Sequence, residues 1–460
     1  MKKKLSLPLE NIIALIAIIG SILLVYFVYN SLFSGTGDDN AEIRRHRSTN
    51  LAEFEARGKN LEQIETFNVK INKKWFLKGK QFSDEEKTIH IKATKTSDIN
   101  NKDIVGIRFD ENELKFELNK NDDGSYSIDL NTDDLTPSAY TLQVVSADKT
   151  NRNKEYVSAK TQFFVSYPLY VSWTMDWEGL PVARKYLNEI DHISAEHSIP
   201  IVHFYNPRNF VGLSKSEANY QTNYVLNRMK NNGDEIGLHL HMWYDMVRSA
   251  GLTPITQPQW NNYGNGRDVP FSEYNKEQSI QLLNWAKQQF LQHGLPEPKS
   301  FRAGGWFTDD ENLAALVETG FIIESSGRDA DARGRGSIRG NWNLGPKTRP
   351  YHPSKNGINL NTKPYYESIW EYPNNCGDSW KYTDTEMIQC FYDNLESGIL
   401  DWPQIVTYLS HPHWFYRDGP KMRKLFAETS KHLYKNDSGP VIYSTQESTL
   451  GFWDEFGNRQ

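Results

Sequence analysis

The part of the chain after Tyr167 alternates between short apolar runs and longer stretches with helical periodicity, and this alternation limits the folds that it can adopt. Helical stretches lie at 182–197 and 277–293. Apolar runs of strand length lie at 169–173, 200–205, 235–240 and 405–409. Strands and helices in alternation are typical of an α/β fold with a parallel sheet or barrel. In such folds the functional side chains lie at the carboxyl ends of the strands, so the polar residues that follow these runs are the candidates for chemistry.

Residues 66–167 have a different pattern, in which apolar and polar residues alternate in short runs. These runs lie at 67–71, 88–92, 114–118 and 140–145, with a turn signal at 121–124. A period of two between turn residues predicts an antiparallel β-sandwich. The stretches 123–130 and 139–144 resemble bacterial immunoglobulin-like modules, which implies a spacer or a weak glycan-binding unit.

The N-terminal segment predicts a membrane anchor. After a cluster of three lysines, residues 11–37 contain no charged side chain, and this length is enough to span a bilayer. No small-residue cleavage site follows, so a retained anchor is favoured over a cleaved signal peptide. Because the lysines precede the span, the N-terminus is expected in the cytoplasm and the rest of the chain outside the membrane. Residues 1–37 are thus the predicted anchor, and the highly charged residues 38–65 a predicted stalk.

The composition argues against one class of partner and leaves the state of the cysteines open. The formal net charge is −6, and no long basic stripe is interleaved with aromatic residues, so nucleic acid is a poor candidate partner. Cys376 and Cys390 are the only two cysteines, and they could form one bridge or remain buried thiols. Twelve of the 13 tryptophans follow residue 167. Tryptophan rings stack on sugar rings, although several must belong to the core of a domain of this size.

Two pairs of polar residues follow predicted strands and could serve a metal ion. Asp176 and Glu178 form the first pair, and His239 and His241 form the second. Residues two apart in a strand project to the same side. A carboxylate pair in this orientation suits one metal ligand and one base, and two neutral imidazoles suit a shared divalent ion. Each pair alone is also compatible with a solvated strand end or with ordinary hydrogen-bonded histidines.

Two further clusters stand at the ends of apolar runs. Arg302 is followed by Gly304 and Gly305, so it could hold a carboxylate close to the backbone, although a structural salt bridge is the simpler interpretation of an arginine alone. His411 and His413 end the last run. They add two more imidazoles to the same predicted edge of the sheet.

The order of these four clusters resembles the polysaccharide deacetylase family, which includes chitin and peptidoglycan N-deacetylases. The resemblance covers about residues 168–448 and includes the strand-like run that ends at Tyr205. It implies an irregular (β/α) barrel of about seven strands over residues 168–460. It also implies a hydrolase that removes N-acetyl groups from a cell-surface or extracellular polysaccharide with a divalent metal, most simply Zn²⁺.

The resemblance assigns a role to each of the matching residues. It makes Asp176 the general base, and Glu178 and His239 metal ligands. It makes Arg302 the residue that orients the base, and His411 the residue that protonates or stabilises the leaving group. The chemistry fits these roles, because an amide is a poor electrophile and the amine that leaves must be protonated.

The sequence departs from the family at one metal ligand. The family's second histidine stands four residues after the first, and Trp243 occupies that position here. His241, or His413 as the spare candidate, must then complete a three-ligand site. Aromatic and histidine side chains in or beside the motifs are candidate substrate contacts: Tyr205, Trp243, Trp306, His413 and Trp414.

Two other functions compete with the deacetylase interpretation. A protein that has kept the barrel but lost the metal could bind or assemble glycans without catalysis. A chitinase-type glycoside hydrolase could use Asp176 and Glu178, although the earlier acids of that motif fall at Val171 and Thr174, which are not acidic.

Overall fold

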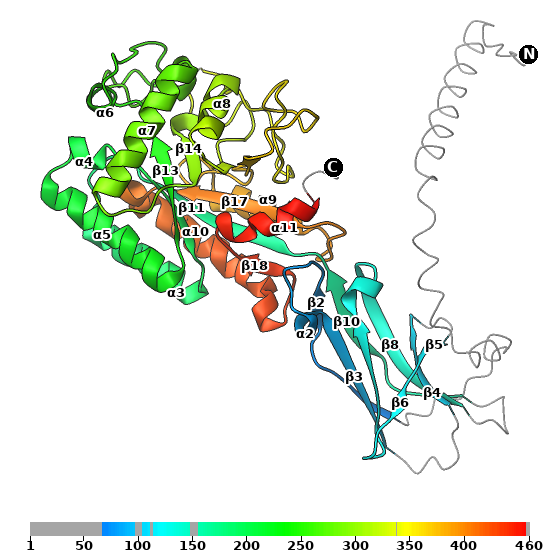
Figure 1. Ribbon diagram of the computed structural model, residues 1–460. Helices are drawn as coiled ribbons and strands as arrows, with labels where there is room; N and C mark the ends of the chain where they lie inside the picture. The colour runs from blue at the N-terminus through cyan, green and yellow to red at the C-terminus, as the bar shows by residue number, and fades with distance from the viewer. Residues whose placement is uncertain (1–66, 97–103, 111–113, 148–154, 337, 457–460) are drawn as a thin grey trace, which may run out of the picture.

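The computed structural model describes residues 67–96, 104–110, 114–147, 155–336 and 338–456, which form two bodies (Figure 1). The predicted anchor and stalk, residues 1–65, lie outside the described residues. Within the described part of the chain, no helix has both the length and the apolar character needed to cross a membrane.

The N-terminal body consists of two sheets that share one hydrophobic core. Phe67, Ile89 and Ile91 of the first sheet pack with Ile107 and Leu142 of the second. The first sheet has the order β1 (Phe67–Ile71), β3 (Thr88–Lys95), β7 (Tyr126–Asn131), β6 (Asn119–Lys120). The second has the order β2 (Trp75–Leu77), β10 (Thr161–Ser166), β8 (Ser138–Ala147), β4 (Ile104–Phe109), β5 (Leu114–Glu117), and β9 (Glu155–Val157) pairs with β8. The four predicted strand runs coincide with β1, β3, β5 and β8.

One strand pair of this body departs from the antiparallel prediction. β2 runs parallel to β10, with Trp75 opposite Phe164. The two aromatic rings stack with centroids 4.5 Å apart, so the pair also contributes side-chain packing. β10 leads directly into the next body through Tyr167 and Pro168, and β2 runs in the same direction beside it.

The C-terminal body is built on a parallel sheet of eight strands. Its order is β16 (Trp370–Glu371), β15 (Ile323–Glu324), β14 (Ser300–Ala303), β13 (Glu235–Leu240), β12 (Ile201–Tyr205), β11 (Leu169–Asp176), β17 (Gln404–Ser410), and β18 (Val441–Tyr443) pairs with β11. All eight residues of β11 are buried, because elements cover both faces of the sheet. This double burial explains why the predicted strands read as continuous apolar runs.

The sheet curls until its two ends meet, as the barrel prediction requires. The segment after β16 returns beside β17, where Cys376 N donates to Thr407 O and Leu409 N donates to Gly377 O. Ser379 N then donates to Leu409 O. Seven strands lie along the main path of this curled sheet, in agreement with the expected number.

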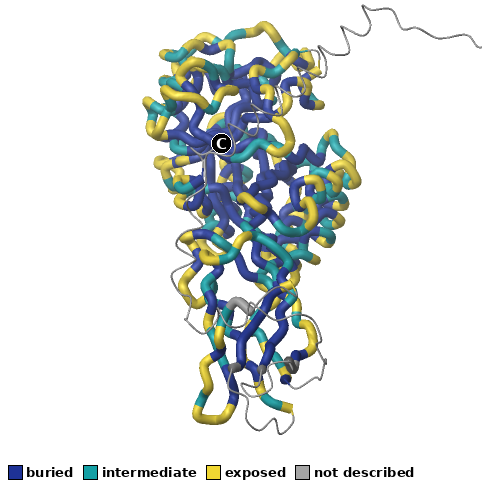
Figure 2. The backbone as a smooth tube through the Cα atoms, turned by 90° about the vertical axis from the view of Figure 1, so that its right-hand side faces the viewer, coloured by how far each residue is buried: buried dark blue, intermediate teal, exposed yellow. Residues whose placement is uncertain are grey.

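Helices surround the curled sheet (Figure 1). The main ones are α3 (Arg184–His197), α5 (Lys215–Asn232), α7 (Lys276–Gln292), α8 (Asp310–Glu318), α9 (Asp384–Leu395) and α10 (Phe415–Thr429). Shorter ones are α2 (Asp84–Lys87), α4 (Asn209–Gly212), α6 (Tyr244–Ser249) and α11 (Leu450–Phe456). α3 and α7 confirm the two predicted helices. Figure 2 shows the buried residues gathered inside and the exposed ones mainly in loops.

Cys376 and Cys390 form a disulfide, which decides the alternative that the sequence left open. Their Cα atoms lie 5.6 Å apart. The bridge ties the segment after β16 to α9, and both residues line a cavity that is described below.

Candidate metal centre

The four predicted clusters meet in one pocket at the carboxyl ends of β11, β13, β14 and β17. The pocket has a volume of about 80 Å³, and carboxylates and imidazoles line its polar part. Aromatic side chains form its walls: Trp260, Tyr263, Trp306, Trp380 and Trp414. A parallel sheet brings the carboxyl ends of its strands to one edge, so residues far apart in the sequence become neighbours there.

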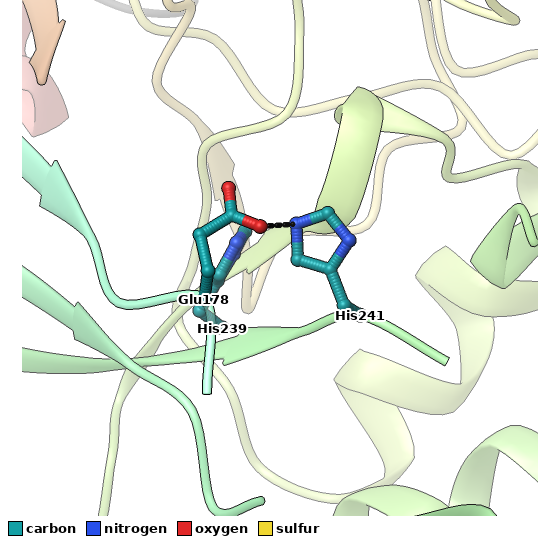
Figure 3. Close-up of side chains that lie close together, drawn as sticks. All are labelled: Glu178, His239 and His241. Carbon is teal, nitrogen blue, oxygen red and sulfur yellow. Dashed lines mark ion pairs between the residues drawn. The ribbon is translucent and has the colours of Figure 1, made fainter. Parts of the chain in front are cut away.

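Glu178, His239 and His241 form a compact group of possible metal ligands. One donor atom from each lies within 4.8 Å of the other two, and all three residues are buried. Nε2 of His241 lies 2.8 Å from Oε2 of Glu178, and the imidazole points at the carboxylate in Figure 3. The two histidines share a side of the chain because they are two residues apart at the end of a strand.

Backbone carbonyls hold both imidazoles in the orientation that a ligand needs. Nδ1 of His239 donates to Arg302 O at 2.9 Å, and Nδ1 of His241 donates to Arg267 O at 2.6 Å. The bond to Arg302 O leaves Nε2 of His239 with its lone pair directed at the centre, whereas Nε2 of His241 contacts Glu178. Nε2 of His239 is buried and has no hydrogen-bond partner among the described residues. Burial lowers the pKa of His239 to about 4, so this imidazole is neutral at physiological pH.

Glu178 stands among three cationic or donor groups. His241 and Arg267 contact Oε2, the latter through Nε and Nη2 at 3.1 Å each. His411 Nε2 lies 3.5 Å from Oε1. Burial alone raises the pKa of Glu178, but these neighbours outweigh it and hold the pKa well below its usual value. Glu178 is therefore a carboxylate anion at neutral pH.

Asp176 lies beside this group and is held by Arg302. Nη1 of Arg302 lies 3.0 Å from Oδ1 of Asp176, while Oδ2 lies 3.8 Å from Nε2 of His239. The guanidinium itself is fixed, because its Nε and Nη2 donate to O and Oγ of Ser325 and its Nη1 also donates to Thr174 Oγ1. One oxygen of Asp176 is thus anchored and the other faces the histidines.

The glycines after Arg302 do not serve the purpose that the sequence suggested. The carboxylate partner of Arg302 is Asp176, on a different strand. Gly304 instead packs against His241, since a Cβ there would lie 2.5 Å from Nδ1 of that imidazole. A glycine is needed at this position because the backbone passes close to the ring.

His411 lies between Glu178 and two further acidic residues. Its backbone N donates to Asp418 Oδ2 at 2.8 Å, and its Nδ1 lies 3.4 Å from the same oxygen. Asp378 Oδ1 lies 3.8 Å from Nδ1. Burial alone would lower the pKa of His411. The three carboxylates outweigh burial and raise the pKa to about 9. This imidazole carries a proton at neutral pH.

The predicted substrate contacts divide into those that line the pocket and those that do not. Trp306 and Trp414 line it. Tyr205 lies in the core, where its hydroxyl bonds to Thr222 Oγ1 at 3.0 Å. Trp243 is buried and its Nε1 donates to Glu178 O at 3.0 Å, so it supports a ligand from behind. The ring of His413 packs on Trp414, with centroids 3.9 Å apart, and neither of its nitrogens bonds to a described residue.

Three charged residues of the site were not predicted, and neither were the wall residues Trp260, Tyr263 and Trp380. Asp378 and Arg267 lie on loops with no periodic pattern, so nothing local marks them. Asp418 stands in α10, seven residues after His411, and a search for an acid near the last histidine could have found it.

Comparison with known proteins gives distant structural likenesses and no sequence match. No protein-family profile matches the chain, and no curated protein matches it. One similar solved structure is described as a polysaccharide deacetylase from Mycobacterium smegmatis: 13% identity, 63% of this chain, 91% of that chain, TM-score 0.40. The peptidoglycan deacetylase PdaC of Bacillus subtilis has 10% identity, covering 63% and 93%, with a TM-score of 0.33. A 4-alpha-glucanotransferase from Thermococcus litoralis has 12% identity, covering 62% and 40%, with a TM-score of 0.37. These values are too low to assign an activity, so the function has to be argued from the residues of the site.

Proposed function

We propose that the chain is a metal-dependent hydrolase that removes N-acetyl groups from a polysaccharide. The observation that carries this proposal is the group formed by Glu178, His239 and His241, with Asp176 on one side of it and His411 on the other. The group combines the ligands, the base and the acid that amide hydrolysis requires.

The donor set fits a divalent ion of the zinc type. Two imidazole nitrogens and one carboxylate oxygen are the ligands of several catalytic zinc sites, which keep a position open for water and substrate. The unpartnered Nε2 of His239 supports this fit, because a buried nitrogen without a partner is costly unless a ligand completes it. Glu178, His239 and His241 would hold the ion. A bound ion of this kind lowers the pKa of water towards about 7 and polarises an amide carbonyl.

Asp176 is the proposed base that takes a proton from the attacking water. Arg302 holds one carboxylate oxygen, so the other remains directed at the centre. A guanidinium is always charged at neutral pH, so Arg302 pairs with Asp176 as a cation and fixes the direction of its carboxylate.

His411 is the proposed acid that protonates the departing amine. Asp418 and Asp378 lie near its Nδ1, and its Nε2 faces the pocket beside Glu178. Both acids keep the imidazole protonated and orient it, so they act as positioning residues. Trp243 has a related supporting role, since its indole N–H holds the backbone carbonyl of Glu178.

The aromatic walls support a sugar as the substrate. Trp306 and Trp414 line the pocket, and Tyr263 at its mouth is 53% exposed. Trp306 is buried and Trp414 half-buried, so Tyr263 is the aromatic ring best placed to stack on a sugar beside the polar centre. The polymer and the position of the acyl group are not specified by these contacts.

The direct test is acetate release by the full-length chain with Zn²⁺ from a panel of N-acetylated glycans, such as chitin oligomers and peptidoglycan. We expect release that a chelator abolishes and that added metal restores, because the ion is needed to activate water and carbonyl. Metal analysis of the same preparation should give bound ion. Acetate release that survives chelation would contradict the proposal.

A second candidate is a glycan-binding protein without a metal. Arg267 favours it, because this cation bonds to the same oxygen of Glu178 that His241 contacts and so competes with an ion for that oxygen. Glycan binding without metal or acetate release would support it. The chitinase alternative fits less well, because the acid of a glycosidase must be protonated and the pKa of Glu178 lies well below its usual value.

We further propose that the enzyme is held in the cell membrane by residues 11–37, with the described residues outside the cytoplasm. The uncharged length and the preceding lysines support this orientation. Protease added to intact cells or right-side-out spheroplasts should digest the chain beyond residue 38. Protection of these residues would overturn the topology.

A further inference from the structure

A second cavity adjoins the candidate metal centre and contains charged and polar groups that the proposed mechanism does not use. Its volume is about 250 Å³. Residues 328–336 and 376–382 border both cavities: Gly334, Asp378 and Trp380 line the metal pocket, while Arg328 and Tyr382 line the second cavity. The two cavities therefore share a wall.

Arg328 is a buried cation in this wall that forms no direct ion pair with a described residue, although Asp378 acts on it at longer range. Its residue is 4% exposed, and no carboxylate lies within ion-pair distance in the part of the chain that the structure describes. Nη2 donates to Tyr382 Oη at 3.2 Å, but Nε and Nη1 have no hydrogen-bond partner. Leaving a buried guanidinium in this state is costly, since buried charges in proteins are normally paired.

Arg302 provides a comparison within the same molecule. It is equally buried, yet all three of its nitrogens have partners and one of them pairs with Asp176. The protein thus provides partners for every nitrogen of Arg302 and leaves Nε and Nη1 of Arg328 unpaired. The guanidinium of Arg328 also lies on the ring of Trp306, 3.9 Å from its centroid, and that ring lines the metal pocket.

Asn374 is a second buried group without partners in the same cavity. It is 1% exposed, and neither its Nδ2 nor its Oδ1 bonds to any residue that the structure describes. Its backbone N donates to Gly327 O, so the residue is held in place while its side-chain amide remains unpaired.

The remaining charges of the cavity do not neutralise Arg328. Glu386 lines the cavity, but its carboxylate already pairs with Arg333 and accepts from the backbone N of Thr383. Asp329 lies on the exposed loop and accepts from the backbone N of Asp331. The cavity therefore combines two free guanidinium donors and a free amide, with its other charged groups already engaged or exposed.

We propose that this cavity is a subsite for a carboxylate carried by a sugar of the substrate. A guanidinium presents a planar fork that matches a carboxylate, and charge-assisted bonds of this type are stronger than neutral ones. The volume admits one sugar or one acidic substituent and excludes a longer segment of polymer. The inference rests on the proposed function for its physiological meaning: the acidic sugar would belong to the same polymer as the acetylated sugar.

The test measures binding of D-glucuronate and D-glucose to the full-length chain by calorimetry, because the two sugars differ in a carboxylate at one carbon. Glucuronate should bind at least about tenfold more tightly, as a charge-assisted hydrogen bond of about 1.5–3 kcal/mol predicts. Arg328→Gln should remove this difference. Arg333→Gln is the matched control, since Arg333 lines the same cavity but is engaged by Glu386, and it should change the affinity less than about threefold.

Several results would overturn the inference. They are absence of glucuronate binding, equal binding of glucose, unchanged affinity in a folded Arg328→Gln, and equal binding of inorganic phosphate. If Arg328→Gln does not fold, Asn374→Asp decides, because a carboxylate added beside Arg328 should abolish glucuronate binding and unchanged binding would refute the site. If the chain releases acetate from neutral glycans but does not bind glucuronate, the subsite is refuted and the proposed function stands. Glucuronate binding without acetate release from any glycan would remove the proposed function and leave the subsite.

Discussion

His241→Ala should lose bound metal and hydrolysis together. Nε2 of His241 lies 2.8 Å from Glu178, and its Nδ1 is fixed by a backbone carbonyl, so alanine removes one of three donors from a preorganised set. Loss of an outer-shell partner alone costs about 10–100-fold in metal affinity or activity, and loss of a ligand should exceed about 100-fold. His239→Ala should behave in the same way. Metal content and acetate release of the purified variants measure both effects.

His413→Ala is the matched control for this prediction. His413 also follows a strand of the same sheet, but its ring nitrogens bond to no described residue. It packs on Trp414 and does not belong to the ligand group. We expect this variant to keep its metal. If His413→Ala loses the ion and His241→Ala keeps it, the three-ligand assignment is wrong.

The fold could be predicted wherever burial imposes a strong periodic pattern. The run at 235–240 coincides with β13, and the run at 169–173 is the first part of β11, which continues to Asp176. Both strands are buried along their whole length, which gives them a continuous apolar pattern. β15 and β16 were missed, since two-residue strands carry too few residues to show a period. Long-range pairing such as the return of Cys376 beside β17 depends on tertiary packing and leaves no local signal.

The site could be predicted where its residues lie at the carboxyl ends of strands. Asp176, His239 and Arg302 are at such positions, and the sheet brings them together. Arg267 and Asp378 reach the pocket from loops, whose course depends on the whole structure. Trp243 was predicted as a substrate contact, but the start of α6 directly after it directs its ring elsewhere. The indole N–H donates to Glu178 O, and the guanidinium of Arg208 lies on the ring.

Arg267 links the two candidate functions to one measurable property. Its Nε donates to Glu178, its Nη2 forms an ion pair with the same oxygen, and its guanidinium lies 4.8 Å from the ring centroid of Trp414. It therefore joins the ligand group to an aromatic wall. A metal ion that binds Glu178 must share or displace this contact. In the deacetylase Glu178 would bind the metal ion, and in the glycan-binding protein it would pair with Arg267. The metal content of the purified chain therefore separates the two candidate functions.

Asp176→Asn should abolish most turnover while sparing the metal. Asparagine keeps an oxygen for Arg302 but cannot accept the proton of water, and a general base contributes about 10²–10⁴-fold to a rate. We therefore expect acetate release to fall by about 10³-fold, which corresponds to about 4 kcal/mol in the activation barrier. Metal content should stay close to that of the unmodified chain, because Asp176 is outside the ligand group. Single-turnover acetate release and metal analysis on one preparation check both statements.

Glu178→Gln gives the contrast that makes the Asp176 result interpretable. This variant also replaces one carboxylate with an amide, but the carboxylate belongs to the ligand group and pairs with His241, Arg267 and His411. We expect it to lose metal and activity in parallel, since a neutral amide is a weaker ligand and leaves three cationic or donor groups without their shared anion. Equal metal loss in the two variants would contradict the division of roles. Metal loss in Asp176→Asn alone would reverse it, making Asp176 the ligand and Glu178 the base.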